Sequence, residues 1–405
     1  MFILNKLIFL LFAQFYTEIL CACRQSYMTF CDDLTDLSSH GVEKWTELVV
    51  GPEFANASQL GTINYDTIQL DRFDKLTTLM ILHEINDLRT NTFDSDPEHS
   101  KLNYLKLYGN DIKRIRESTF AAVTLSKLSL VNNNIEYIHK EAFYNCEITT
   151  IDLSDNKLEK VEKDVFTEEF LSNVTKEIII RNNRLEWIES FSFPSSLEIL
   201  NLDYNKLSTF NYNVFHNLQN LQELTMSHNK LKSLPGLKPL KEIVIIDVSH
   251  NELITLTASD FNNLSRLEVL DMSHNKIYTS MVFEKFNFPK RHPPLQISLA
   301  FNRLTHLIIG CDSFRDHIVF LYGNPWSCRC WENLEKFMVD NKVRRNECDF
   351  QFFGNGQVPY CIDQPENDCT KPFFKNITKL DLEEFTNKVK KSQKNVKCNL
   401  SPRTL

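Results

Sequence analysis

The sequence predicts an α/β solenoid, in which short strands from successive coils line up as one parallel sheet. Three stretches carry this prediction: Leu224–Leu231, Ile246–Leu253 and Leu270–Ile277. In each of them, apolar residues stand five and three positions before an asparagine, and another stands two positions after it. The alternating part is typical of a short strand whose apolar side chains face a core. The asparagine amide is expected to bond backbone groups at the turn that follows the strand.

A repeat of roughly 20–29 residues with this pattern is the signature of a leucine-rich repeat. The pattern recurs along the chain at Asn110, Asn133, Asn156, Asn183, Asn205, Asn229, Asn251, Asn275, Asn302 and Asn324. A degenerate unit with Leu76, Leu79 and Ile81 precedes them, and it carries Glu84 where the asparagine belongs. Each unit must stack on a neighbour to bury its apolar edge. We therefore expect a curved horseshoe with a concave parallel sheet.

Phenylalanine is unusually common, at 30 residues, and the repeat explains why. One stands ten positions after the asparagine in six units, at Phe120, Phe143, Phe166, Phe193, Phe215 and Phe261. Buried aromatic side chains at one repeat position are expected to stack on each other. The sequence thus predicts an aromatic spine beneath the convex side.

The chain divides into five segments: a signal peptide at 1–22, an N-terminal cap at 23–75, the repeats at 76–324, a cysteine-rich C-terminal cap at 325–370, and a basic tail at 371–405. The first segment has Lys6 before a short apolar stretch, which is typical of a secretory signal. No other stretch reaches the length of a membrane span. A net charge of −8 without a basic stripe gives no reason to expect nucleic acid. We expect a secreted, extracellular protein.

An oxidising compartment favours disulfides, and Cys23 and Cys31 are placed to close a small loop in the N-terminal cap. Cys146 occupies a position that other repeats fill with Val or Leu, so it is interpreted as a buried small hydrophobe. Cys311 lies about seven repeats from Cys146, which at roughly 4.8 Å per repeat is too far for a disulfide between them. Five sequons are candidate glycosylation sites: Asn56, Asn173, Asn263, Asn376 and Asn399.

The variable positions between the buried leucines are predicted to form one extended binding surface. Tyrosine and arginine are the side chains that most often dominate binding energy, and apolar residues on an open face are costly without a partner. The candidate binding residues of this concave face are Tyr108, Ile179, Arg181, Tyr204, His228, His250, His274, Phe301, Phe320 and Tyr322.

The three histidines occupy one position in successive repeats and should stack about 5 Å apart. They could bind zinc or sense pH, but the favoured interpretation is that Ser-His-Asn simply suits the turn, since no further ligand is placed beside them. Asp152, Asp247 and Asp271 form a similar row, interpreted as a solvated polar face. No metal or cofactor is expected.

Known catalytic and phosphate-binding motifs are absent from the sequence, and His83-Glu84 lacks the second histidine of a zinc protease motif. We therefore predict a binding protein and no enzyme. The tail from Asn376 to Ser401 is predicted to be helical, with Leu382, Phe385, Val389 and Val396 on one side. This helix could dock on its own repeats, pair with a partner helix or touch an anionic surface.

The stretch Asn324-Pro325-Trp326-Ser327-Cys328-Arg329-Cys330, followed by spaced cysteines, resembles the C-terminal cap of extracellular leucine-rich repeat proteins such as Toll-like ectodomains. The resemblance implies a Cys328–Cys348 disulfide, and a second one from Cys330 to Cys361 or Cys369. The spare cysteine would then pair with Cys398 or with a partner. Our working assignment is Cys330–Cys369 with Cys361–Cys398.

As a whole, the chain resembles secreted insect leucine-rich repeat proteins, and in layout the leucine-rich immune proteins of mosquitoes that lack a long coiled coil. The resemblance implies a protein of innate immunity in haemolymph. Its partner would be a complement-like thioester protein, another leucine-rich repeat protein or a microbial surface. Two alternatives stay open. One is an adhesive or developmental extracellular protein of the Slit or decorin type, and the other is a protein inhibitor of the ribonuclease-inhibitor type, which the signal peptide disfavours.

Overall fold

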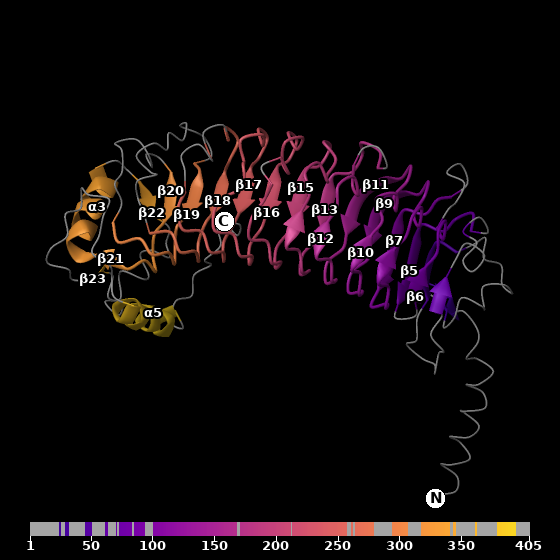
Figure 1. Ribbon diagram of the computed structural model, residues 1–405, viewed down its shortest axis with the longest axis horizontal. Coiled ribbons are helices and arrows are strands. Elements are labelled where there is room, and N and C mark those ends of the chain that lie inside the picture. The colour runs from indigo at the N-terminus through magenta and orange to yellow at the C-terminus, as the bar shows by residue number, and fades with distance from the viewer. Residues whose placement is uncertain are drawn as a thin grey trace, which may run out of the picture. The chain divides into compact units, whose positions relative to one another are not determined.

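A computed structural model describes the structure of 24–25, 29–31, 45–50, 61–63, 70, 73–82, 85–93, 100–167, 171–211, 213–256, 261, 264–278, 294–306, 317–340, 343–345, 361–362 and 379–393. The chain forms two compact units, Met1–Leu197 (unit 1) and Glu198–Leu405 (unit 2). Each unit consists of stacked coils whose strands form a parallel sheet, so the fold is the predicted leucine-rich repeat solenoid (Figure 1).

The sheet of unit 1 begins with an antiparallel pair of strands and then takes one strand from each coil. In order across the sheet these are β1 (Arg24–Gln25), β2 (Thr29–Cys31), β3 (Glu47–Val50), β5 (Thr78–Leu82), β7 (Tyr104–Tyr108), β9 (Thr124–Ser129), β11 (Glu147–Asp152) and β13 (Glu177–Ile179). Only β1 and β2 pair antiparallel among these described strands. Three small parallel pairs accompany the sheet: β4 (Gly61–Ile63) with β6 (Ile85–Leu88), β8 (Arg114–Ile115) with β10 (Tyr137–Ile138), and β12 (Lys160–Val161) with β14 (Trp187–Ile188).

Unit 2 continues the same design and adds the C-terminal elements. Its sheet runs through β15 (Ile199–Asn201), β16 (Glu223–Thr225), β17 (Ile245–Asp247), β18 (Val269–Asp271), β19 (Gln296–Ser298), β20 (Ile318–Phe320) and β22 (Arg344–Arg345). A short pair, β21 (Trp326–Ser327) with β23 (Cys361–Ile362), stands beside helix α3 (Cys328–Asp340). The second helix, α5, spans Lys379–Gln393.

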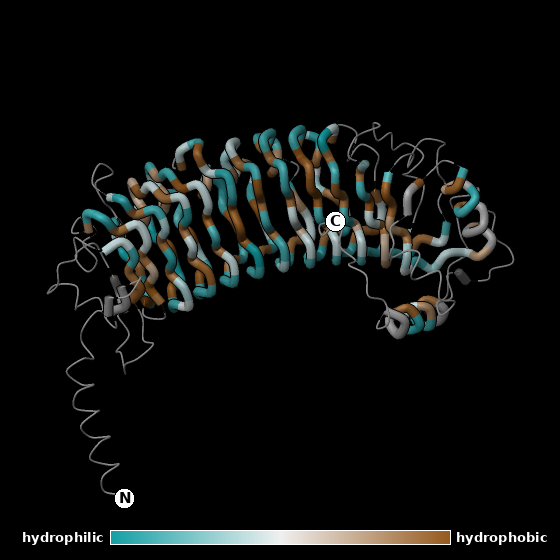
Figure 2. Tube along the Cα trace, turned by 180° about the vertical axis from the view of Figure 1, so that it is seen from behind, coloured by the Kyte–Doolittle hydropathy of each residue, from teal (hydrophilic) through white to brown (hydrophobic). Residues whose placement is uncertain are grey.

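The register of the strands explains the core. Leu224, Ile246 and Leu270 are paired from strand to strand in unit 2, and each is fully buried. Figure 2 shows the hydrophobic residues recurring from coil to coil. Because every coil places its apolar positions at the same height, the buried residues form continuous columns through each unit.

The ladder asparagines bond backbone groups at the turn, as predicted, and they bond the backbone of the preceding coil as well. Asn251 donates from Nδ2 to the carbonyl oxygens of Met226 at 2.9 Å and Val248 at 3.1 Å. Its Oδ1 accepts a hydrogen bond from the backbone N–H of Leu231 at 3.0 Å. Asn229, Asn275 and Asn302 repeat these contacts in their own coils. A buried amide at this position therefore joins each coil to the preceding one.

The aromatic spine is confirmed in unit 1 and extends one ring further than predicted. Phe93, Phe120, Phe143, Phe166 and Phe193 stack with ring centroids 5.3–6.0 Å apart. All five side chains are fully buried. In unit 2, Phe215 and Phe261 are buried as well.

The parallel sheet begins earlier than the sequence pattern showed, because β2 and β3 lie in the segment predicted as a cap and continue the sheet from β5. Cys146 is fully buried, as expected, and burial raises the pKa of its thiol to about 12. Cys328 and Cys330 are both disulfide-bonded. The bonds predicted for Cys23, Cys31, Cys348, Cys361, Cys369 and Cys398 stay predictions, and Cys311 lies outside the described residues.

Several other predictions also fall outside the described residues: the signal peptide at 1–22, and the sequons at Asn56, Asn263, Asn376 and Asn399. The remaining sequon, at Asn173, lies in an exposed turn of unit 1. No helix among the described residues has the length and hydrophobicity that crossing a membrane requires.

Candidate binding surfaces

Unit 1 presents large side chains on its strand face. The position two residues before the ladder asparagine holds Tyr108, Val131, Ser154 and Arg181 in successive coils. Arg181 is exposed, whereas Tyr108 and Ile179, at the ends of β7 and β13, are partly buried. The Nζ of Lys106 lies 5.0 Å from the centroid of the Tyr108 ring. These candidates therefore lie where the sequence placed them, on one side of one sheet.

The strand face of unit 2 is different, because its corresponding side chains are small and buried. Ser227, Ser249 and Ser273 occupy the position that Tyr108 and Arg181 hold in unit 1, and each is only 6% exposed. At these variable positions, the strand face of unit 2 therefore exposes much less side-chain surface than the sequence predicted.

Two of the predicted binding residues are corrected by their burial. Phe320 is 0% exposed and Tyr322 is 1% exposed, so neither lies on an open face. The sheet continues past Phe320 into the C-terminal cap, where β20 pairs with β22. Tyr322 packs edge-on against Phe301, with ring centroids 5.1 Å apart and planes at 83°. The repeat pattern ends before β22, so it could not show this covering.

The row of aspartates is also corrected, since it is not a solvated face. Asp247 and Asp271 are 8% and 4% exposed. The Oδ1 atoms of Asp152, Asp247 and Asp271 each accept a hydrogen bond from the backbone N–H two residues later, at 3.1, 2.9 and 2.9 Å. Side chains of this type commonly satisfy a turn in this way. Asp247 and Asp271 therefore shape the turns that carry His250 and His274.

Five rings stack in a continuous row in unit 2, which we call the ring ladder: Tyr204, His228, His250, His274 and Phe301. Successive ring centroids are 4.1, 4.1, 4.0 and 4.3 Å apart, and the planes are within 17° of parallel. The stacking of the three histidines was predicted, but its extension to Tyr204 and Phe301 was not. All five immediately precede a ladder asparagine, which is the signal that could have revealed the full row.

The backbone at this position explains why the ladder is unusual. All five residues have a φ between 53° and 56°, in the left-handed region. The equivalent position in unit 1 holds Gly109, Asn132, Asp155 and Asn182, which are the residue types that tolerate this conformation best. Large rings are rare there, so the strain must be offset by their surroundings. Face-to-face stacking along the ladder supplies that stabilisation.

The ladder geometry does not suit a zinc ion. Two successive spacings of 4.1 and 4.0 Å place the rings of His228 and His274 about 8 Å apart. A zinc ion requires each ligand nitrogen at about 2.0–2.1 Å. The three imidazoles therefore cannot bind one zinc ion together, which favours the interpretation as turn residues.

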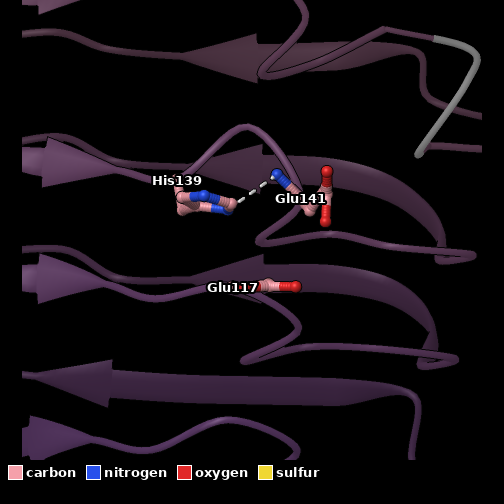
Figure 3. Close-up of side chains that lie close together, drawn as sticks. All are labelled: Glu117, His139 and Glu141. Carbon is pink, nitrogen blue, oxygen red and sulfur yellow. Dashed lines mark hydrogen bonds between the residues drawn. The ribbon is translucent and has the colours of Figure 1, made fainter.

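One cluster with metal-ligating atoms occurs among the described residues, in neighbouring coils of unit 1 (Figure 3). It consists of Glu117, His139 and Glu141. The Nδ1 atom of His139 accepts a hydrogen bond from the backbone N–H of Glu141 at 3.2 Å, and Lys140 Nζ lies 3.4 Å from Glu141 Oε1. Glu117 is exposed. We interpret this cluster as a polar patch, in which His139 and Glu141 already have partners.

Burial disfavours the charged form of the ladder histidines. The pKa of His274 is lowered to about 4, first by burial and then by His250 and His228. The pKa of His250 is also lowered, by burial and by His228, while Asp247 opposes the shift. At neutral pH these two side chains therefore present uncharged imidazoles, which stack without charge repulsion.

Helix α5 lies over the end of the ring ladder, and the two line an open pocket of about 580 Å³. Its contacting side chains are Leu382, Phe385, Thr386 and Val389, spaced so that they share one helix face. Phe385 and Val389 are 6% and 4% exposed. The opposite wall includes His250, His274, Phe301, Lys276 and Arg303. Of the three alternatives for the tail, docking on its own repeats is the one observed, although Val396 lies outside the described residues.

Comparison with known proteins agrees with this architecture. A "Leucine rich repeat" family model matches 174–231, and a "BspA type Leucine rich repeat region (6 copies)" model matches 54–172. No curated protein matches the sequence at a significant level.

Two solved structures are similar over most of the chain. The leucine-rich repeat domain of APL1B has 17% identity and a TM-score of 0.57, over 91% of this chain and 93% of that one. The Drosophila Toll–Spatzle complex gives 17% identity and a TM-score of 0.55, over 74% of this chain and 43% of that one. The chain spans 52% of the length of TLR13, in a complex with single-stranded RNA, at 19% identity over 78% of this chain and a TM-score of 0.49. The coils, the asparagine ladder and the similarities to APL1B and Toll together establish the fold as a leucine-rich repeat solenoid.

Proposed function

We propose that the protein is a secreted binding scaffold of innate immunity, which captures a protein partner on the strand face of unit 1. The observation that carries this proposal is the contrast between the two units. Unit 1 displays Tyr108, Ile179 and Arg181 at positions where the coils of β16, β17 and β18 in unit 2 hold buried threonine, aspartate or serine. Tyrosine and arginine on a rigid sheet are typical of protein-binding hot spots.

The fold similarities support the choice of class. Leucine-rich repeat solenoids typically serve as binding proteins, and APL1B matches across nearly the full length of both chains. The Toll–Spatzle structure is a protein complex of development and innate immunity. The sequence resemblance to mosquito immune proteins favours a complement-like thioester protein, another leucine-rich repeat protein or a microbial surface as the partner.

An adhesive or developmental extracellular role is the second candidate, because the same exposed face would also suit a matrix or receptor partner. A pull-down separates the two. Tagged full-length protein would be recovered from haemolymph with and without reducing agent, and bound proteins would be identified by mass spectrometry. A thioester or leucine-rich repeat partner is expected. Recovery of matrix or receptor proteins alone would favour the adhesive role.

The binding face is tested in the same assay with Arg181→Glu. We expect the partner to be lost, since the change reverses the charge of an exposed side chain on the proposed surface. Arg114→Glu is the matched control, because Arg114 is also exposed in unit 1 but lies in β8, outside the main sheet. Equal capture by wild type and Arg181→Glu would contradict the strand face as the binding surface.

A further inference from the structure

The cavity between helix α5 and the ring ladder is an open pocket lined by residues of both elements. Its volume of about 580 Å³ lies within the range of small-molecule sites, roughly 300–1,000 Å³. The helix therefore roofs a space of ligand size.

The lining of this cavity is amphipathic. The roof consists of one α5 face with Leu382, Phe385 and Val389, and Phe301 adds an aromatic ring from the wall. The ladder asparagines at the floor use their amides for backbone hydrogen bonds, so they attract a ligand only weakly. An aliphatic or aromatic group would thus fill the space under the helix and remove apolar surface from water.

The charges at the cavity are all positive among its described lining residues. Lys276 and Arg303 line it, and no aspartate or glutamate does. Lys276 already forms an ion pair with Glu252 at 2.8 Å. No ion pair of Arg303 occurs within the described part of the chain, and its side chain is exposed. Arg303 is therefore the group best placed to bind an anion, and its planar guanidinium matches a carboxylate.

We propose that this cavity binds a small amphipathic carboxylic acid. The hydrocarbon part would lie between α5 and Phe301, and the carboxylate would bind Arg303 at the cavity entrance. The uncharged imidazoles of His250 and His274 complete the wall. This site is separate from the strand face of unit 1, so either proposal can fail without the other.

The test is isothermal titration calorimetry of the delipidated full-length protein with decanoate. We expect saturable one-to-one binding, and about tenfold weaker binding by Arg303→Gln, because a charge-assisted hydrogen bond is lost. Binding of decanol, which has no carboxylate, should be the same in wild type and Arg303→Gln. Arg184→Gln is the matched control, since Arg184 also follows a ladder asparagine and is exposed, but belongs to unit 1.

A second variant tests the cavity itself. Thr386→Phe would place a ring in the space while adding apolar surface to the docked helix face, so decanoate and decanol should both bind at least tenfold more weakly. Circular dichroism would verify that α5 stays helical. Absence of saturable decanoate binding to wild type would overturn the proposal. So would equal decanoate affinities of wild type, Arg303→Gln and Thr386→Phe.

Discussion

The ring of Phe301 occupies the space that a side chain on Gly323 would need. A Cβ atom built on Gly323 would approach Cδ1 and Cε1 of Phe301 more closely than real Cβ contacts allow. Gly323 also has a φ of 72°. In its own coil it holds the position that Phe301 holds in the preceding coil, directly before the ladder asparagine. The missing side chain thus ends the ring ladder and lets Phe301 meet Tyr322 edge-on.

We expect Gly323→Ala to destabilise the protein by about 2–4 kcal/mol, from backbone strain and overpacking together. Denaturant unfolding of the full-length protein would measure the loss. Gly109→Ala is the control, because Gly109 has a φ of 69° at the same position of unit 1, beside the smaller Asn132 of the next coil. Equal losses in the two variants would mean that the Phe301 contact contributes nothing.

The asparagine ladder should be the most sensitive part of the repeat. Replacing Asn251 by alanine leaves the backbone groups of Met226, Val248 and Leu231 without this partner, and we expect a loss of about 3 kcal/mol. Asn134→Ala is the control, since Asn134 is partly exposed and its amide bonds the side chain of Asp111. A small effect of Asn251→Ala on denaturant unfolding would show that water replaces the amide.

The sequence was sufficient to predict the solenoid because one period fixes both the strand and its turn. The position of Asn251 relative to Leu253 determined the hydrogen bonds that the structure shows, and the spacing of Phe120 and Phe143 determined their stack. The extension of the sheet to β2 and β3 was missed, since the coil of β3 lacks the asparagine that marks the others. A clear repeat pattern predicts the strand of its own coil. Where the pattern is degenerate, pairing with the strand of the neighbouring coil sets the register.

The candidate surface was predicted only in part, for a physical reason. The repeat shows which positions leave the core, but it does not show what covers them. Tyr322 is buried by packing against Phe301, and α5 covers His274 from a segment more than a hundred residues away in sequence. Such contacts depend on tertiary packing and have no periodic signature.

The ladder should make stability depend on pH. The folded pKa of His274, about 4, lies below the ordinary value near 6.5, so the unfolded chain takes up a proton first as the pH falls. The contribution of His274 to the free energy of unfolding is fully present above about pH 6.5. It is lost as the pH approaches 4, which lowers the free energy of unfolding by roughly 2–3 kcal/mol. Thermal unfolding from pH 7 to pH 4 would measure this loss.

The variant that isolates this effect is His274→Asn, because asparagine holds the same position in unit 1 at Asn132 and Asn182. We expect a flatter dependence of stability on pH between 6.5 and 4 than in wild type. His216→Asn removes an exposed histidine and serves as the control. An unchanged slope for His274→Asn would assign the acid sensitivity to other groups.

Helix α5 should depend on its docking to stay folded. A helix of 15 residues is marginal in water on its own, so most of its stability must come from the buried face. Phe385→Ala removes the larger of the two side chains that are buried in the described part of α5, and we expect docking to weaken by about 2 kcal/mol or more. Hydrogen exchange would then show faster exchange at the α5 amides, with the coils of unit 1 unchanged.

Glu384→Gln is the control, because it removes only an exposed ion pair with Lys388, worth about 0.3–0.5 kcal/mol. If α5 amides exchanged equally fast in wild type and Phe385→Ala, the helix would not be held by this contact.

If the Phe385→Ala change does weaken the docking of α5, water should reach His274. The pKa of that imidazole should then rise toward its ordinary value, which an NMR titration of the same variant would detect.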